Sequence, residues 1–277
     1  MNNETILESL EGFIQDQKAE AARQAALETA VQSARKLHRS WAPLLNFCSS
    51  IGLLPIEAST NGLERDWTYS ISRIAMKRPS LYIPVMKRLA VHAKNREQLR
   101  IEKGGTTPEN WNQLWNFFRE LDDAGAVAEL KKDVRSISCL VNSDYLRYFD
   151  GDWAEKGLLY LVEKTVKDFS QESRKSHSLF WNVKLARNQP WNTAAFELDS
   201  VACVDDRTYV FEVKTGALLP IDKWFARWQL FERPGRSVFV QCSAGDFDYR
   251  PFMPLHLFSL ANFERLFKAR LRRDFAL

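Results

Sequence analysis

The sequence of 277 residues lacks the marks of membrane, zinc-binding and disulfide-bonded proteins. No apolar run approaches the about 18 residues that indicate a membrane-spanning helix, and the N-terminal Met-Asn-Asn-Glu-Thr has no basic leader followed by an apolar segment. The four cysteines are far apart and form no Cys-x-x-Cys pair. We therefore expect a soluble, cytoplasmic protein whose cysteines are reduced and buried.

A strong net charge is missing as well. The 39 Lys and Arg residues against 35 Asp and Glu residues leave a formal charge of +4, which does not by itself indicate nucleic-acid binding. The hydrophobic share of 45% is enough for a proper core. The length allows two domains or one large one.

What is present is an acid-bearing hairpin at residues 196–216. Side chains alternate along a strand, so Asp199 faces one side of the first strand, and Glu212 and Lys214 share one side of the second. A two-residue turn at residues 205–206 would place Asp199 directly opposite Glu212. Glu212 and Asp199 therefore converge, with Lys214 pointing at the same place.

Opposed carboxylates destabilise a strand pair, and a divalent cation between them removes that fault. Hard oxygen ligands suit Mg²⁺ or Mn²⁺, which bind through one or two carboxylates together with water and substrate phosphate. The ammonium of Lys214 can orient the attacking water or stabilise charge that develops on a phosphate.

A third acid precedes the hairpin. Residues 152–166 have helical rather than strand periodicity, and Glu155 lies on or beside the inward face of this helix. A carboxylate there needs a partner, and the metal site is a candidate. The apolar stripe of the helix comprises Leu158, Leu161, Val162, Thr165 and Phe169.

An acid on a helix, then Asp199, then Glu212-x-Lys214 resembles the PD-(D/E)xK nuclease superfamily, with Leu198 in place of the usual proline. Three sequence segments are similar to segments in the nuclease half of certain CRISPR-ancillary effectors. They are Tyr-Leu-Arg-Tyr-Phe-Asp-Gly-Asp-Trp-Ala-Glu at 145–155, Phe-Glu-Leu-Asp at 196–199 and Phe-Glu-Val-Lys-Thr-Gly at 211–216. The resemblance covers roughly residues 121–277. It does not include the Rossmann-like CARF domain with which those effectors sense a cyclic oligoadenylate.

The resemblance implies a metal-dependent nuclease acting on DNA and conceivably RNA, in defence against foreign nucleic acid. Asp199 and Glu212 would hold Mg²⁺ or Mn²⁺, with the main-chain carbonyl of Val213 as a further ligand. Glu155 would assist, and Lys214 would position the water. The family also implies a homodimer, and a separate sensor subunit could dock on residues 1–104.

Alternatives stay open at this point. Glu197 shares a face with Asp199 and is either part of the site or a rim acid. The chain could instead be a catalytically inactive nuclease fold that binds nucleic acid or a partner, or a nuclease of restriction, transposition or repair.

Two basic helices also bear on function. A helix at about 222–231 places Lys223 and Arg227 where they could line the substrate side, while Trp224 and Trp228 pack inward; solvent exposure is the alternative. The cations of a final helix at about 262–274 either complement its C-terminus or contact phosphates.

The domain organisation that we expect is an α+β fold in three parts. Residues 1–104 form a helical region of unknown role. Residues 105–150 form a winged-helix-like connector with a capped helix at 108–123 and a hairpin, whose Lys131, Lys132 and Arg135 offer an alternative DNA contact. Residues 151–277 form a restriction-endonuclease-like α/β core with a mixed sheet.

Overall fold

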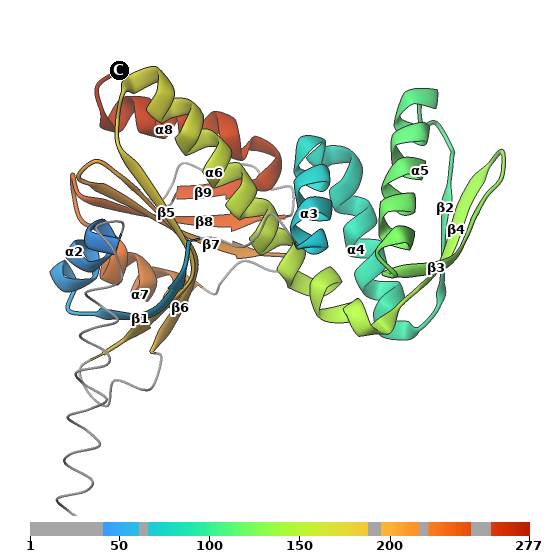
Figure 1. Cartoon of the computed structure of the whole chain (residues 1–277), viewed down its shortest axis with the longest axis horizontal. Coiled ribbons are helices and arrows are strands. Elements are labelled where there is room, and N and C mark those ends of the chain that lie inside the picture. Colours follow the sequence, from blue (N-terminus) through green and yellow to red (C-terminus); the bar gives the residue numbers. More distant parts are fainter. Residues whose placement is uncertain (1–40, 61–65, 188–194, 216–220, 245–255) are drawn as a thin grey trace, which may run out of the picture. The chain divides into compact units, whose positions relative to one another are not determined.

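The computed structural model describes residues 41–60, 66–187, 195–215, 221–244 and 256–277 (Figure 1). Residues 44–277 form one unit. The first 40 residues of the expected helical region 1–104 lie outside the described residues. None of the helices in these ranges is long and apolar enough to cross a membrane.

A mixed six-stranded sheet carries the predicted hairpin, in the order β1-β5-β6-β7-β8-β9. The pairs from β1 to β7 are antiparallel, and those from β7 to β9 are parallel. The strands are β1 (Leu54–Ser59), β5 (His177–Ala186), β6 (Phe196–Val204), β7 (Arg207–Lys214), β8 (Ser237–Ser243) and β9 (His256–Ser259). The expected α+β class with a mixed sheet is confirmed.

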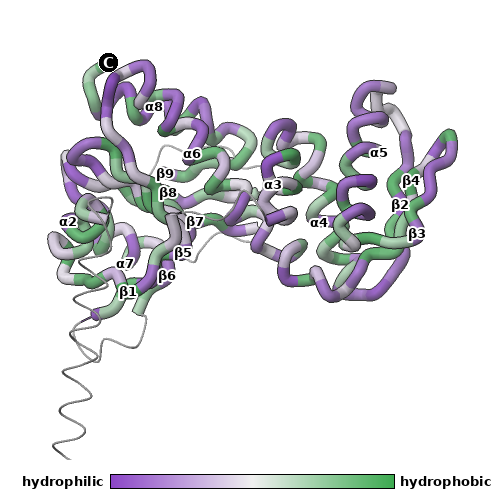
Figure 2. The backbone as a smooth tube through the Cα atoms, in the orientation of Figure 1, coloured by the Kyte–Doolittle hydropathy of each residue, from purple (hydrophilic) through white to green (hydrophobic). Residues whose placement is uncertain are grey.

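Helices cover both faces of this sheet. Phe211 on β7 contacts Phe263 and Phe267 of α8 (Phe263–Asp274), which packs beside α6 (Trp153–Ser173). Phe239 on β8 instead contacts Trp224 of α7 (Ile221–Phe231). Every residue of β8 is buried, as expected for a strand covered on both sides. In Figure 2, hydrophobic residues gather around β8 and β9.

A three-stranded sheet of order β2-β4-β3 lies in the part that we expected to be a connector. Its hairpin, β3 (Val127–Lys132) and β4 (Ser136–Val141), follows α5 (Pro108–Asp123) as predicted. The Thr107 hydroxyl accepts a hydrogen bond from the Asn110 amide and so caps α5. α5 ends just before Gly125, which adopts a φ of +72° that favours glycine.

The expectation that residues 1–104 are almost entirely helical is wrong at two places. Besides α2 (Ala42–Ser50), α3 (Trp67–Lys77) and α4 (Pro79–Asn95), this region contains β1 and β2 (Gln98–Glu102). β1 is an edge strand beside β5, a position that tolerates its proline. β2 pairs with β4, so one small sheet crosses the expected boundary at residue 104.

The core is continuous between the two sheets, running from α3 to α8. All five residues of the predicted apolar stripe on α6 are buried, and so are all four cysteines, which form no disulfide. Gly157 of α6 allows α3 to approach closely, because a Cβ there would lie 2.9 Å from Cγ of Met76. Met76 lies in the last turn of α3, so this end of α3 packs directly on α6.

Candidate active site

The β6–β7 hairpin has the register that the sequence predicts. Its turn occupies residues 205–206, and the strands pair from Val204 with Arg207 to Ser200 with Phe211. This register continues directly toward the predicted pair of acids, whose side chains therefore lie near the open end of the hairpin.

The ladder ends one step before Asp199 and Glu212 would pair. Instead, Oδ2 of Asp199 accepts a hydrogen bond from the main-chain N–H of Val213 at 2.6 Å. The two strands separate at this point, so the carboxylate of Asp199 takes the place of a ladder carbonyl. This arrangement fixes the carboxylate beside Glu212.

A cavity of about 620 Å³ opens at this end of the hairpin. The residues that line it include Glu155 from α6, Asp199 from β6, Glu212 and Lys214 from β7, and Arg227 from α7. Four predicted catalytic residues and one predicted substrate-binding residue thus share one cavity, although they come from four separate elements.

Two other predicted residues have more peripheral positions. Glu197 is exposed, lines the cavity and stands across the strand pair from Lys184 of β5, which favours its reading as a rim acid. Lys223 is exposed on α7 and is not among the residues that line the cavity, so its role in substrate binding stays a prediction.

Glu212 is the buried charge of the site, with only 3% of its surface exposed. Its Oε1 lies 2.9 Å from Nζ of Lys214, and its Oε2 contacts the guanidinium of Arg227. A buried carboxylate without partners would be strongly destabilising, and these two cations compensate it. Arg227 therefore does not simply face solvent.

Two acids of the cavity, Asp199 and Glu155, have raised pKa values. Burial, followed by the negative charges of Glu212 and Glu155, raises the pKa of Asp199 well above its usual range, although the Val213 N–H and Lys214 oppose this. Burial, followed by the charge of Asp152, also raises the pKa of Glu155. The carboxylates of the cavity thus repel one another, and a further cation bound there would reduce this repulsion.

The donor set fits Mg²⁺ or Mn²⁺ better than it fits a metal held by protein alone. Within the described ranges, no group of three or more His, Cys, Asp or Glu residues stands close enough to hold an ion by itself. Mg²⁺ usually keeps several waters and needs only one or two carboxylates. The hard oxygens of Asp199 and Glu212 meet that requirement.

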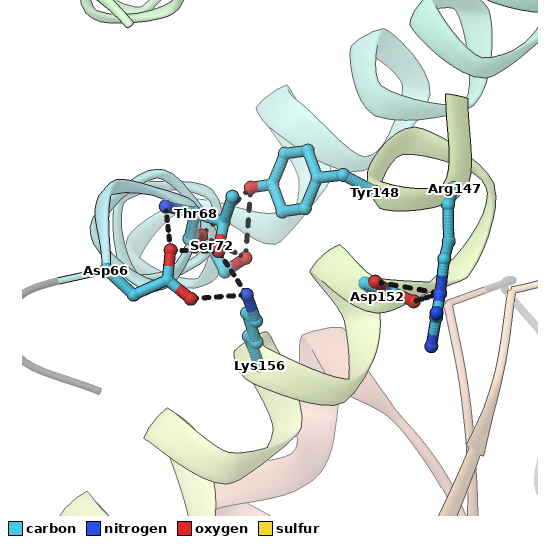
Figure 3. Close-up of polar contacts among 7 residues, drawn as sticks. All are labelled: Asp66, Thr68, Ser72, Arg147, Tyr148, Asp152 and Lys156. Atoms are coloured by element: carbon cyan, nitrogen blue, oxygen red, sulfur yellow. Dashed lines mark hydrogen bonds and ion pairs between the residues drawn. The ribbon is translucent and has the colours of Figure 1, made fainter. Parts of the chain in front are cut away.

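A second polar cluster reaches the same cavity, which the sequence did not lead us to expect (Figure 3). Nζ of Lys156, next to Glu155 on α6, lies 2.6 Å from Oδ2 of Asp66 and also contacts the Thr68 hydroxyl. Asp66 caps α3 by accepting from the Thr68 amide. Tyr148 donates to the Thr68 carbonyl at 3.0 Å. The cluster ties the start of α3 to the first turn of α6, next to Glu155.

Burial alone would raise the pKa of Asp66, but its hydrogen bonds from Lys156 and Thr68 outweigh this and lower it. The sequence could have predicted the capping role of Asp66, since this residue directly precedes a helix, where a capping residue is favoured. The pairing of Asp66 with Lys156 could not be predicted, because the two residues lie far apart in the chain.

Asn182 on β5 is another residue that the sequence did not single out. It lines the cavity and adopts a positive φ of 48°, a conformation that asparagine tolerates better than most residues. The β5–β6 register skips it between the pairs of Trp181 with Ser200 and Val183 with Leu198. This irregularity lies across from Asp199, where β6 leaves β7.

The cations of α8 contribute chiefly to the fold. Lys268 and Arg272 pair with Glu172 of α6, at 2.5 and 3.4 Å, and Arg270 pairs with Asp274 at 2.6 Å. These pairs favour the structural alternative for the final helix over phosphate contact.

Comparison with known proteins shows a similarity of fold alone. No protein-family model and no curated protein matches the chain. Among solved structures, protein VC1899 from Vibrio cholerae has a TM-score of 0.50 at 16% identity over 84% of this chain. Can2 from Sulfobacillus thermosulfidooxidans, in complex with cyclic tetra-adenylate, has a TM-score of 0.51 at 11% identity over 84% of this chain. The chain spans 61% and 60% of the lengths of these two proteins.

Proposed function

We propose that this protein is a metal-dependent nuclease that hydrolyses phosphodiester bonds of DNA, with RNA as a second substrate class to test. The observation that carries the proposal is the convergence of Glu155, Asp199, Glu212 and Lys214 in one cavity. These are the residues that the resemblance to PD-(D/E)xK nucleases assigns to catalysis.

Asp199 and Glu212, with the carbonyl of Val213, would hold Mg²⁺ or Mn²⁺. When bound, such an ion would polarise the phosphate and lower the pKa of a neighbouring water. Holding the ion also stabilises the charged form of Asp199, whose pKa is otherwise raised by its neighbours. Glu155 would accept hydrogen bonds from water in the same cavity.

In this proposal, Lys214 and Arg227 act in catalysis in addition to pairing with Glu212. Both cations are paired with Glu212, and both line the cavity. In the proposed reaction, Lys214 would orient the nucleophilic water and Arg227 would bind the substrate phosphate. Cations placed in this way stabilise the charge that develops in the transition state.

A role in defence against foreign nucleic acid is the biological part of the proposal. It is supported by the sequence resemblance to the nuclease half of CRISPR-ancillary effectors and by a fold similar to that of Can2. Control by a cyclic oligoadenylate, the class of ligand bound in the Can2 structure, is a further part of the proposal, with a separate sensor subunit docked on residues 1–104. A homodimer, as in many nucleases of this class, would allow both strands to be cut.

A cleavage panel tests the reaction. Supercoiled plasmid, linear duplex, single-stranded DNA and single-stranded RNA are each incubated with Mg²⁺, Mn²⁺ or EDTA, using wild type and Glu212→Ala. We expect metal-dependent cleavage of at least one substrate by wild type and none by the variant. Absence of cleavage by wild type with either metal, or equal cleavage by the variant, would contradict the proposal.

The second candidate function is binding without cleavage, favoured by one observation: Glu212 already has two cationic partners. Calorimetric titration with Mn²⁺ of wild type and Glu212→Gln distinguishes the two functions. A nuclease binds the ion more tightly than its Gln variant does, whereas an inactive binding protein shows no difference.

A further inference from the structure

A second cavity, of about 330 Å³, adjoins the catalytic one. Its lining residues are Arg187, Phe196, Ala226, Arg227, Gln229 and Leu230. Phe196 and Arg227 line both cavities, so the second is a continuation of the first between the start of β6 and the outer turns of α7. A volume of this size lies at the lower end of the range for ligand pockets, about 300–1,000 Å³.

The walls of the second cavity are suited to an aromatic ligand that carries a phosphate. The ring of Phe196 is half-buried, and its orientation is fixed by an edge contact with buried Phe231, at 5.9 Å between ring centroids. The guanidinium of Arg187 lies over the same ring, 5.2 Å from its centroid. No acid is among the six lining residues.

We propose that this second cavity binds an unpaired nucleobase of the substrate, next to the phosphate that is cut. The inference rests on the proposed nuclease function. The base stacks on Phe196, the guanidinium of Arg187 contributes to the stack or to the adjacent phosphate, and Arg227 joins the two cavities. Base stacking on aromatic side chains tolerates any sequence because every base has a π-face.

The position of Phe196 on β6 agrees with this assignment. Phe196 and Asp199 are three residues apart on β6, which corresponds to about 10 Å along a strand. A base on Phe196 therefore belongs to a nucleotide close to the cleaved bond. Such a base must leave the double-helical stack to reach the ring, so the cavity selects single-stranded or locally opened substrates over intact duplex.

The experiment measures binding without cleavage. Fluorescence anisotropy in EDTA gives the affinity of wild type for a labelled 12-nucleotide poly(dT), for an abasic oligonucleotide of the same length and for the corresponding duplex. The same titrations are made with Phe196→Leu. The matched control is Phe225→Leu, since Phe225 is exposed on α7 and lines neither cavity.

We expect wild type to bind poly(dT) at least about 5-fold more tightly than the abasic strand, in line with stacking on one base. Phe196→Leu should remove most of this preference without weakening abasic binding, and Phe225→Leu should retain it. The comparison within wild type stands even if Phe196→Leu fails to fold.

Equal affinity of wild type for base-bearing and abasic strands would overturn the inference, and so would preference for duplex or an equal loss for both strands in Phe196→Leu. Because no metal is present, the result is independent of catalysis. An inactive protein that still discriminates bases would refute the nuclease proposal and leave the second cavity as a base-binding site.

Discussion

The two sheets of this protein treat charge differently. In the six-stranded sheet, the side chain of Glu212 is 4% exposed and is held by Lys214 and Arg227. In the part with the three-stranded sheet, ion pairs such as that of Arg78 with Glu109 lie at the surface, with side chains 45% and 69% exposed. Burial of a charge is unfavourable unless partners compensate it. The region of Glu212 therefore carries a desolvation penalty that the exposed pair of Arg78 with Glu109 does not have. The buried carboxylate of Glu212 lies in the cavity that we propose as the active site.

The largest expected effect is on cleavage. Glu212→Gln should reduce metal-dependent cleavage by at least about 100-fold, because a neutral amide holds Mg²⁺ poorly and a catalytic ion contributes several kcal/mol. Initial rates of plasmid cleavage measure the loss. The matched control, Glu109→Gln, lies in the other region and should cleave at the wild-type rate; a similar loss there would remove the contrast between the regions.

The next effect concerns stability. Arg227→Met leaves Glu212 with Lys214 alone and should lower the free energy of unfolding by about 2–3 kcal/mol. Arg78→Met breaks only an exposed pair and should change it by under about 1 kcal/mol. Urea denaturation of both variants gives the two values. Equal losses would show that the burial of Glu212 has no special energetic weight.

A pH-dependent effect is expected at the edge of the catalytic cavity. The folded-state pKa of Asp66 lies below its ordinary value of 3.8, so the unfolded chain binds the proton more readily. The stabilisation is therefore present above the ordinary pKa and is lost as pH falls through the folded pKa. Wild type should melt above Asp66→Asn at pH 6, and the difference in melting temperature should shrink as pH falls below 3.8. A difference that is constant with pH would contradict this account.

The smallest effect is expected at the β3–β4 hairpin. The exposed Lys131 and Lys132 lie there, and Lys132 stands over the ring of Trp115 at 5.3 Å. If this part is a connector, Lys131→Ala with Lys132→Ala should change DNA affinity by less than about 2-fold. Two phosphate contacts would instead reduce the slope of log affinity against log salt by about 1.8, and that result would make the hairpin a DNA-binding element.

Local signals explain which parts of the fold the sequence predicted. The helix at Pro108–Asp123 has a cap, a proline and a glycine stop, all of which depend on neighbouring residues. The register of the β6–β7 hairpin follows from its two-residue turn. Both were predicted because near neighbours in the chain determine them.

The parts that were missed depend on distant partners. β1 contains a proline, and it becomes a strand only because β5, more than a hundred residues later, pairs with it. The contact of Lys156 with Asp66 was missed for the same reason, because it also joins residues that lie far apart in the chain. For the candidate site, the residue types were readable from the sequence, but the burial of Glu212 between two cations was not, since Arg227 comes from a separate helix.

The most direct test of the central claim is the cleavage of supercoiled plasmid in Mn²⁺ by wild type and Asp199→Asn, with EDTA as the control. Asp199→Asn keeps the shape of the side chain and can still accept the hydrogen bond from Val213, so the fold should be preserved. We predict that wild type nicks or linearises the plasmid only with the metal, and that the variant leaves it supercoiled. Cleavage by Asp199→Asn at the wild-type rate would contradict the assignment of this cavity as a nuclease site.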